Sequence, residues 1–211
     1  MITMRWRHLA LTVLYLAGFA GAPLFAQSAS GSDAALLAEV RHSFTLRDKL
    51  IPPEIFRDFG DGDLGDSGAI WVTVDIEAAI GSELYGDSIK QEHGWVIQTK
   101  PNQSMNGSER TDYKFIGSTN NGLLVVLASY SGGGSGVFYS LHILDLATAR
   151  GFDSEGKIYR RINLTNIRSV ILGDRWDGDA SIAKNTIRVT TTRDGPVGGS
   201  RPAMTIEAQR P

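Results

Sequence analysis

Residues 121–146, NGLLVVLASYSGGGSGVFYSLHILDL, contain the pattern that decides the fold expected for this chain. Two apolar runs, Leu123 to Ala128 and Val137 to Leu144, flank a serine- and glycine-rich segment. Only a turn suits so many glycines in a row, because they lack the side chains that pack in a strand. The pattern therefore predicts a β-hairpin. Both faces of its second strand are mostly apolar, so we expect the hairpin to lie inside a sheet that is covered on both sides.

Short strand-like segments separated by turn residues make up most of the rest of the chain. The expected strands are 70–76, 95–99, 113–117, 157–164, 167–172, 180–183, 186–192 and 203–208. Loops are expected at 85–93, 101–112 and 194–202, and a tight turn at Lys184-Asn185. No internal repeat of fixed period supports a propeller. The predicted fold is mainly β, an antiparallel sandwich or barrel-like sheet with one N-terminal α-helix.

The N-terminal helix is predicted from apolar residues at steps of four. Leu36, Val40 and Phe44 form its stripe, Ser32 or Asp33 can cap its start, and Pro52-Pro53 should end it. A second, short helical turn is expected at 77–84. The amphipathic stripe indicates that the first helix packs on the β-rich part of the chain.

The first 26 residues predict a secretory signal peptide. Arg5 and Arg7 precede an apolar run at 9–22, and the small residue Ala26 precedes a polar one. Cleavage is expected after Ala26, or else after Ala29. An uncleaved anchor is the alternative, but glycines and a proline interrupt the roughly 20 apolar residues that a membrane span needs. The expected organisation is a signal peptide at 1–26, a linker and helix at 27–57 and a β-rich domain at 58–211.

Composition restricts the compartment and the partners. The chain has no cysteine, so neither a disulfide framework nor a lipid-bearing cysteine after the signal is expected. Removing residues 1–26 takes away two of the 21 basic residues and none of the 23 acidic ones, which moves the net charge from −2 to −4. This balance argues against a nucleic-acid surface and against adhesion to anionic lipid. We expect a soluble periplasmic protein without a membrane anchor.

An acidic segment before the first expected strand is a candidate calcium site. Asp58, Asp61, Asp63 and Asp66 alternate with glycines, and calcium requires several converging oxygen ligands. The spacing does not follow the EF-hand pattern, because position 12 from Asp61 is a valine. The alternative is an acidic, solvated turn.

The connector Asp174-Arg175-Trp176-Asp177 is a candidate ligand site. A flat indole ring beside carboxylates is a combination that sugar-binding sites use. The alternative is a structural turn in which the aspartate folds inward and the tryptophan packs over the edge of a sheet.

No catalytic motif is recognisable. The glycine run is followed by a strand-like segment and no lysine, which argues against a phosphate-binding loop. Gly133 to Val137 does not have the G-x-S-x-G pattern of a nucleophile elbow. The scarce histidines are not spaced as zinc ligands, and His142, between apolar neighbours, is expected to be a hydrogen-bonded core residue.

The segments LLVVLASYSGGGSGVFYSLHIL (123–144) and LGDRWDGDASIAKNTIRV (172–189) resemble paired elements of bacterial periplasmic proteins and lipoproteins. In that group a GGSG-F-x-x-L hairpin is followed by an LGDR turn, and no established activity can be transferred from it. The stretch from Asp58 to Asp66 resembles the aspartate-rich strand opening of FG-GAP repeats, with its asparagine missing. The resemblance implies an exported β module.

The expected function is a binding or accessory module of the cell envelope, more in keeping with a non-enzyme, whose partner is an unknown protein or an envelope glycan. An enzyme needs an acid, a base and a nucleophile within hydrogen-bond reach, and the sequence indicates no such set. One alternative is a carbohydrate-active hydrolase that pairs Asp61 or Asp63 with Asp174 or Asp177. Another is an inhibitor or immunity-type protein that binds an exported enzyme. No cofactor other than calcium is expected.

Overall fold

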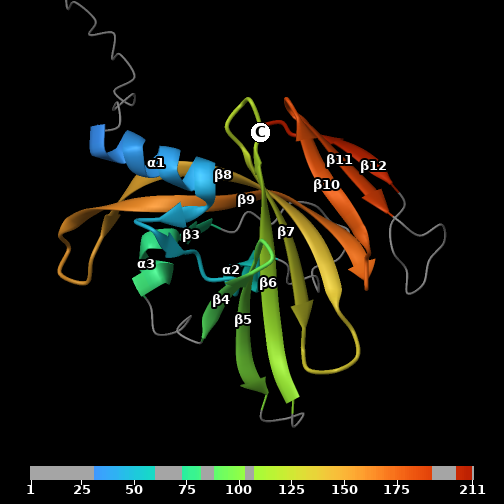
Figure 1. Ribbon diagram of the computed structural model, residues 1–211. Helices are drawn as coiled ribbons and strands as arrows, with labels where there is room; N and C mark the ends of the chain where they lie inside the picture. The colour runs from blue at the N-terminus through green and yellow to red at the C-terminus, as the bar shows by residue number, and fades with distance from the viewer. Residues whose placement is uncertain (1–30, 60–72, 82–87, 103–106, 192–202, 211) are drawn as a thin grey trace, which may run out of the picture.

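The computed structural model describes residues 31–59, 73–81, 88–102, 107–191 and 203–210. Within these ranges the chain is mainly β, as predicted, with a curled antiparallel seven-stranded sheet and few helices (Figure 1). The elements in chain order are α1 (Gly31–Ser43), β1 (Thr45–Leu46), β2 (Lys49–Leu50), α2 (Ile55–Phe59), β3 (Thr73–Asp75), α3 (Ile76–Gly81), β4 (Ile89–Glu92), β5 (Trp95–Asn102), β6 (Gly107–Ser118), β7 (Leu124–Ser131), β8 (Phe138–Phe152), β9 (Ile158–Asp174), β10 (Gly178–Ala183), β11 (Thr186–Thr191) and β12 (Met204–Glu207).

The strands form three antiparallel sheets. The seven-stranded sheet has the order β3-β9-β8-β7-β6-β5-β4, in which β4 to β9 follow one another as a meander and β3 adds to the far edge of β9. A second meander, β10-β11-β12, forms a separate three-stranded sheet, and β1 and β2 form a small hairpin. The predicted pairing across Lys184-Asn185 is confirmed.

The predicted central hairpin is confirmed as β7 and β8, which pair from Leu124↔Leu144 to Tyr130↔Phe138. Side chains from Leu123, the residue before β7, to Val126 alternate between two hydrophobic cores because successive residues of an extended chain point to opposite faces. Leu124 and Val126 belong to one core, whereas Leu123 and Val125 belong to the other. All four are fully buried, so the sheet is covered on both sides as expected.

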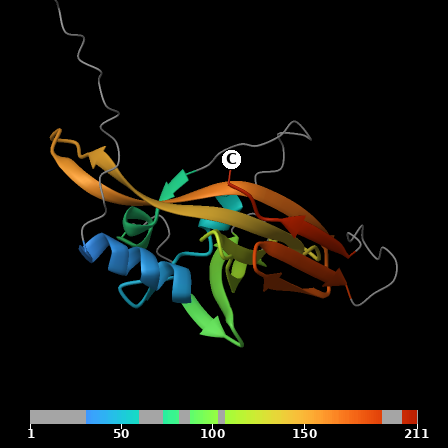
Figure 2. The same cartoon turned by 90° about the horizontal axis from the view of Figure 1, so that it is seen from above.

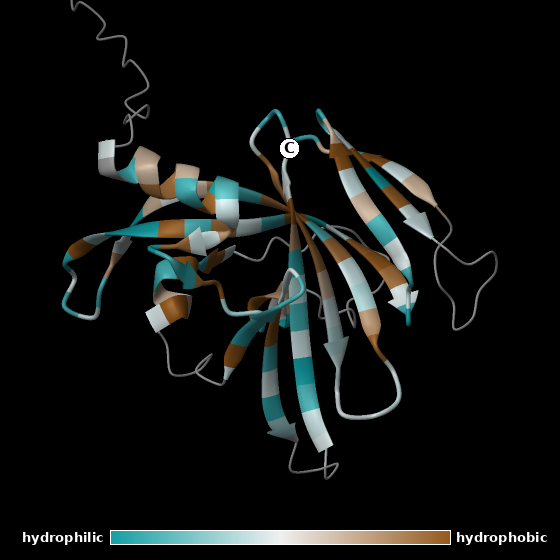
Figure 3. Cartoon of the chain, viewed as in Figure 1, coloured by the Kyte–Doolittle hydropathy of each residue, from teal (hydrophilic) through white to brown (hydrophobic). Residues whose placement is uncertain are grey.

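Different elements cover the two faces. The helices α1, α2 and α3 and the β1–β2 hairpin contribute to the first core, together with β5 to β9. The three-stranded sheet packs on the other face through Ile187, Val189 and Ile206. Figure 2 shows α1 and the three-stranded sheet at different ends of the curled sheet, and Figure 3 shows hydrophobic residues where the long strands meet in the middle.

The N-terminal helix ends nine residues before the predicted prolines. Its last backbone bond runs from the Phe44 N–H to the Val40 carbonyl, and Phe44 has a left-handed backbone (φ 55°). The chain then turns at Arg47 and Asp48, both also left-handed, to form the β1–β2 hairpin. The prediction was wrong because Phe44, read as a helical core residue, ends the helix and still packs in the core.

Several strand boundaries also differ from the prediction. The expected loop at 85–93 contains strand β4, and the expected loop at 101–112 is mostly the paired ends of β5 and β6. The expected strands 157–164 and 167–172 are one strand, β9, and the expected strand at 70–76 is described only as β3 before α3 begins at Ile76. The sequence pattern did not reveal these strands because they contain many polar residues. Edge strands and protruding strands need not show the alternation of apolar and polar residues that marks a half-buried strand.

Candidate functional site

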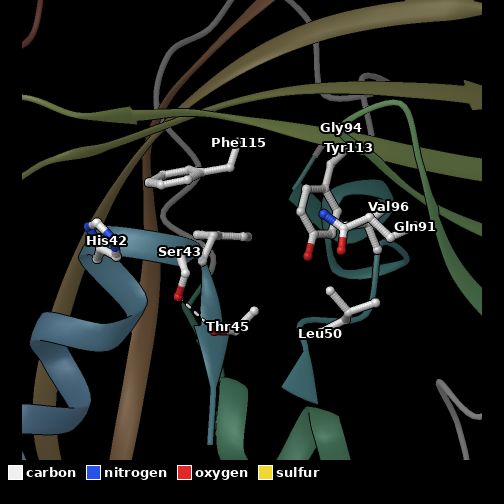
Figure 4. A pocket seen from close by; sticks show the side chains of 10 residues that line it. His42, Ser43, Thr45, Leu50, Gln91, Gly94, Val96, Tyr113 and Phe115 are labelled. Atoms are coloured by element: carbon white, nitrogen blue, oxygen red, sulfur yellow. Dashed lines mark hydrogen bonds between the residues drawn. The ribbon is translucent and has the colours of Figure 1, made fainter. Parts of the chain in front are cut away.

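A pocket of ≈ 210 Å³ lies between the end of α1 with the β1–β2 hairpin on one side and strands β4 to β6 on the other (Figure 4). Polar and apolar groups share its wall, and the hydroxyl, amide and imidazole groups contribute at least as much of the lining as the apolar side chains. Its lining residues are His42, Ser43, Phe44, Thr45, Leu50, Gln91, Gly94, Val96, Tyr113 and Phe115.

The hydroxyl of Tyr113 is the polar group that sets this pocket apart. The side chain projects from β6 and lines the pocket (Figure 4), its residue is 2% exposed, and its hydroxyl lies at the pocket wall with almost no surface open to water. Within the described chain this hydroxyl finds no acceptor for its proton, which is unusual for a buried polar group. Burial raises the pKa of Tyr113 well above its ordinary value, and a hydrogen bond from the Ile51 backbone to the tyrosine oxygen opposes that shift only in part. The group is therefore a neutral hydrogen-bond donor at neutral pH.

Phe44 positions the aromatic wall of the pocket. Its left-handed backbone turns the chain at the end of α1, so its ring points back toward the sheet. The ring stacks on Phe115 (centroids 5.2 Å apart, 19° between planes) and meets Tyr113 edge-on (5.3 Å, 77°). These contacts hold the Tyr113 ring in place, because edge-on and stacked aromatic pairs are the favoured arrangements.

Hydroxyl groups at the end of α1 form part of the polar lining. The Ser43 hydroxyl donates to the Glu39 carbonyl (3.0 Å) and lies 2.7 Å from the Thr45 hydroxyl. The Glu39 carboxylate accepts from the Thr45 hydroxyl (3.4 Å) and from the Asp48 backbone N–H (2.9 Å). The carboxylate thus anchors the β1–β2 hairpin next to the pocket.

Sequence reasoning missed this pocket. Phe44 stood in the helical stripe and Tyr113 in an expected strand, but Gln91 lay in a stretch interpreted as loop. One signal was available in the sequence: the aromatic residue Phe44 stands at the end of the helical stripe. If the chain reverses direction there, its ring can contact the elements packed against the helix.

The structure places the predicted ligand residues 174–177 in a tight connector between β9 and β10. The Asp174 carboxylate accepts the Val137 backbone N–H (2.8 Å) and pairs with Arg175 (3.2 Å). Arg175 donates from its backbone to the Val137 carbonyl (2.7 Å) and from its side chain to the Ser135 carbonyl (2.6 Å). The connector therefore fastens the glycine-rich turn of the central hairpin.

Trp176 of this connector faces inward, and Asp177 is exposed. The indole ring is buried in the second core, 5.9 Å from the Tyr139 ring, so it offers no open stacking face. These contacts are those expected of the structural turn, and ligand binding by the connector stays a prediction.

The predicted calcium ligands lie largely outside the described residues. Asp58 is in α2, without a described side chain, and Asp61, Asp63 and Asp66 fall in the segment that the structure does not describe. Among the residues it does describe, no group of three or more histidine, aspartate or glutamate side chains is placed to hold a metal ion.

His142 is a hydrogen-bonded core residue, as predicted. It is fully buried, with its Nε2 2.8 Å from the Ser140 hydroxyl and its Nδ1 3.0 Å from the Ser169 hydroxyl. Asn166 donates to Ser169 (2.7 Å), and the Phe56 ring packs 5.3 Å from the imidazole. Burial lowers the pKa of His142 to about 4. A hydrogen bond with Asn166 favours the charged form and opposes this shift only in part. The imidazole is neutral at pH 7.

None of the helices in the described ranges has both the length and the apolar character needed to cross a membrane. Comparison of the chain with protein-family models, with curated proteins and with solved structures finds no match.

Proposed function

We propose that this protein is an exported, non-catalytic binding module of the cell envelope that holds a small ligand in the pocket beside α1. The buried hydroxyl of Tyr113, which finds no acceptor for its proton among the described residues, supports this proposal more than any other observation. Leaving a buried hydroxyl without a partner costs about 1–3 kcal/mol, and a ligand that accepts its hydrogen bond recovers that energy. A site with a polar group prepared in this way favours an occupant of defined chemistry.

The pocket selects its ligand by size and by one hydrogen bond. Its volume of ≈ 210 Å³ exceeds the roughly 150 Å³ of an apolar cavity that admits benzene, so it has room for one ring with a small substituent. Phe44 and Phe115 line the pocket with aromatic rings, and Tyr113 donates to the acceptor of the ligand after a small side-chain shift uncovers its hydroxyl. The ligand class is therefore a small molecule with one ring that carries a carbonyl or hydroxyl oxygen.

The hydroxyls and imidazole of the pocket support binding over catalysis. Ser43 is oriented by the Glu39 carbonyl and by Thr45, and the hydrogen bonds of the described chain do not join it to a histidine. A serine nucleophile requires a base within hydrogen-bond reach.

Thermal unfolding of the full chain with two ring-sized probes tests the proposal. Acetophenone carries a carbonyl acceptor and toluene does not, so acetophenone should raise the midpoint of the wild type further. Tyr113→Phe should abolish that difference. It should also leave the ligand-free protein about as stable as the wild type, because the buried donor that lacks an acceptor is gone.

Tyr139→Phe is the matched control, since it removes a tyrosine hydroxyl on the opposite face of the sheet. It should keep the difference between the probes. The proposal is wrong if the two probes act alike on the wild type, or if Tyr113→Phe preserves the preference for acetophenone.

A further inference from the structure

The ends of β8 and β9 form an arm that extends beyond the curled sheet. β7 pairs with β8 only as far as Leu144, and β3 pairs with β9 only from Asn163 to Thr165. Beyond these points, residues 148–152 and 158–162 pair with one another. In both views the turn of this arm is the outermost part of the described chain on its side (Figures 1 and 2).

Local contacts hold the arm in a defined shape. The Asp153 carboxylate accepts the backbone N–H groups of Glu155 (3.0 Å) and Lys157 (2.8 Å), and Gly156 takes the left-handed conformation that the turn needs. Asp33 of α1 forms an ion pair with Arg160, midway along the arm. The tip is therefore presented in one orientation relative to α1.

Three large side chains are exposed at the tip. Phe152 (70% exposed) and Ile158 (57% exposed) lie directly opposite each other across the two strands and share one face. Tyr159 (41% exposed) lies on the other face, with its ring over Gly151, where a Cβ atom would come within 2.8 Å of the ring. Both faces of the tip thus carry apolar surface.

The charge of the arm opposes that of the rest of the chain. Residues 150–161 contain four basic residues, Arg150, Lys157, Arg160 and Arg161, and two acidic ones, Asp153 and Glu155, which gives +2. Because Asp33 pairs with Arg160, the arm together with Asp33 carries +1. The whole chain carries −2, so the other 198 residues sum to −3. The overall balance that argued against anionic lipid therefore does not describe this end of the molecule.

We propose that the tip of the β8–β9 arm docks on an anionic phospholipid surface, with Phe152 and Ile158 entering the interface and the neighbouring basic side chains facing the headgroups. Apolar burial combined with attraction to anionic lipid is sufficient for such interfacial binding. The tip is small for a protein–protein interface. A stable interface needs about 800 Å² from each partner, whereas aromatic side chains supply only roughly 150–250 Å² each.

Co-sedimentation with vesicles tests the proposal. The wild type and its variants are prepared with the same N-terminus, which mass spectrometry verifies. Each is mixed with vesicles of phosphatidylcholine alone or of phosphatidylcholine with added phosphatidylglycerol. The wild type should sediment with the anionic vesicles and less as salt rises. Phe152→Ser with Ile158→Ser should weaken binding by about tenfold or more, because two large apolar side chains lose their burial. Lys157→Glu should weaken it several-fold.

Phe138→Ser with Ile171→Ser is the matched control, because these residues are similarly exposed but lie on the sheet away from the arm. This variant should bind vesicles as the wild type does. Equal loss in the arm and control variants, or no binding of the wild type to anionic vesicles, overturns the proposal. So does capture by neutral vesicles that is insensitive to Phe152→Ser with Ile158→Ser. A protein partner in place of lipid would show as arm-dependent association in vesicle-free periplasmic extract without vesicle binding.

Discussion

The side-chain amide of Asn121 donates a 2.9 Å hydrogen bond to the carbonyl oxygen of Ala208. This bond joins the turn between β6 and β7 to the residue that follows β12. The Asn121 backbone N–H donates to the side-chain oxygen of Asn185 (3.0 Å), and the Ala208 N–H donates to the Asn185 carbonyl (2.8 Å). Three segments far apart in sequence are thereby fixed together, which holds the three-stranded sheet on the curled sheet.

Asn121→Ala should lower the free energy of unfolding by about 1–3 kcal/mol, because the Ala208 carbonyl loses its donor in a partly buried position. Urea unfolding measures the change. Asn120→Ala is the control, since Asn120 is exposed and bonds to the Lys184 carbonyl through its backbone. A similar loss in both variants would show that the side-chain amide of Asn121 is not what joins the sheets.

Gly178→Ala should destabilise the fold severely, by about 3 kcal/mol or more. A Cβ atom at Gly178 would overlap the Thr190 carbonyl oxygen and the Trp176 ring, so the backbone of β10 or β11 would have to move. Gly134→Ala meets nothing within 4 Å and should change stability by no more than about 0.5 kcal/mol. Chemical denaturation, monitored by tryptophan fluorescence, compares the free energies of unfolding of the two variants. Equal stability of the two variants would contradict the close packing at Gly178.

His142 should make the protein acid-sensitive. Its folded pKa of about 4 lies below the ordinary 6.5, so between these values the unfolded chain binds a proton that the folded chain does not. Stability is therefore fully present above pH 6.5 and falls as the pH drops toward 4, by about 3 kcal/mol in total. His142→Gln should flatten this acid limb in urea melts taken from pH 7 to 4. An unchanged slope would mean that other groups cause the acid sensitivity.

The central hairpin could be predicted because its signals are local. Glycines between two apolar runs dictate a turn, and continuous apolar character from Leu123 to Ala128 requires cover on both faces. The β10–β11 turn and the core position of His142 followed from the same kind of local pattern. The strands at 89–92 and 107–112 were missed because their residues are mostly polar, and only pairing with neighbours makes them strands.

The sequence by itself determined a mainly β protein built around a two-sided hairpin, because backbone preference and apolar periodicity act over a few residues. Only the tertiary structure decided where the pocket and the arm lie. Phe44 and Tyr113 form one pocket because a left-handed turn after α1 returns the chain to the sheet. Phe152 and Ile158 are exposed because β8 and β9 extend beyond the ends of the neighbouring strands β7 and β3. The sequence of one strand does not determine where its neighbours end.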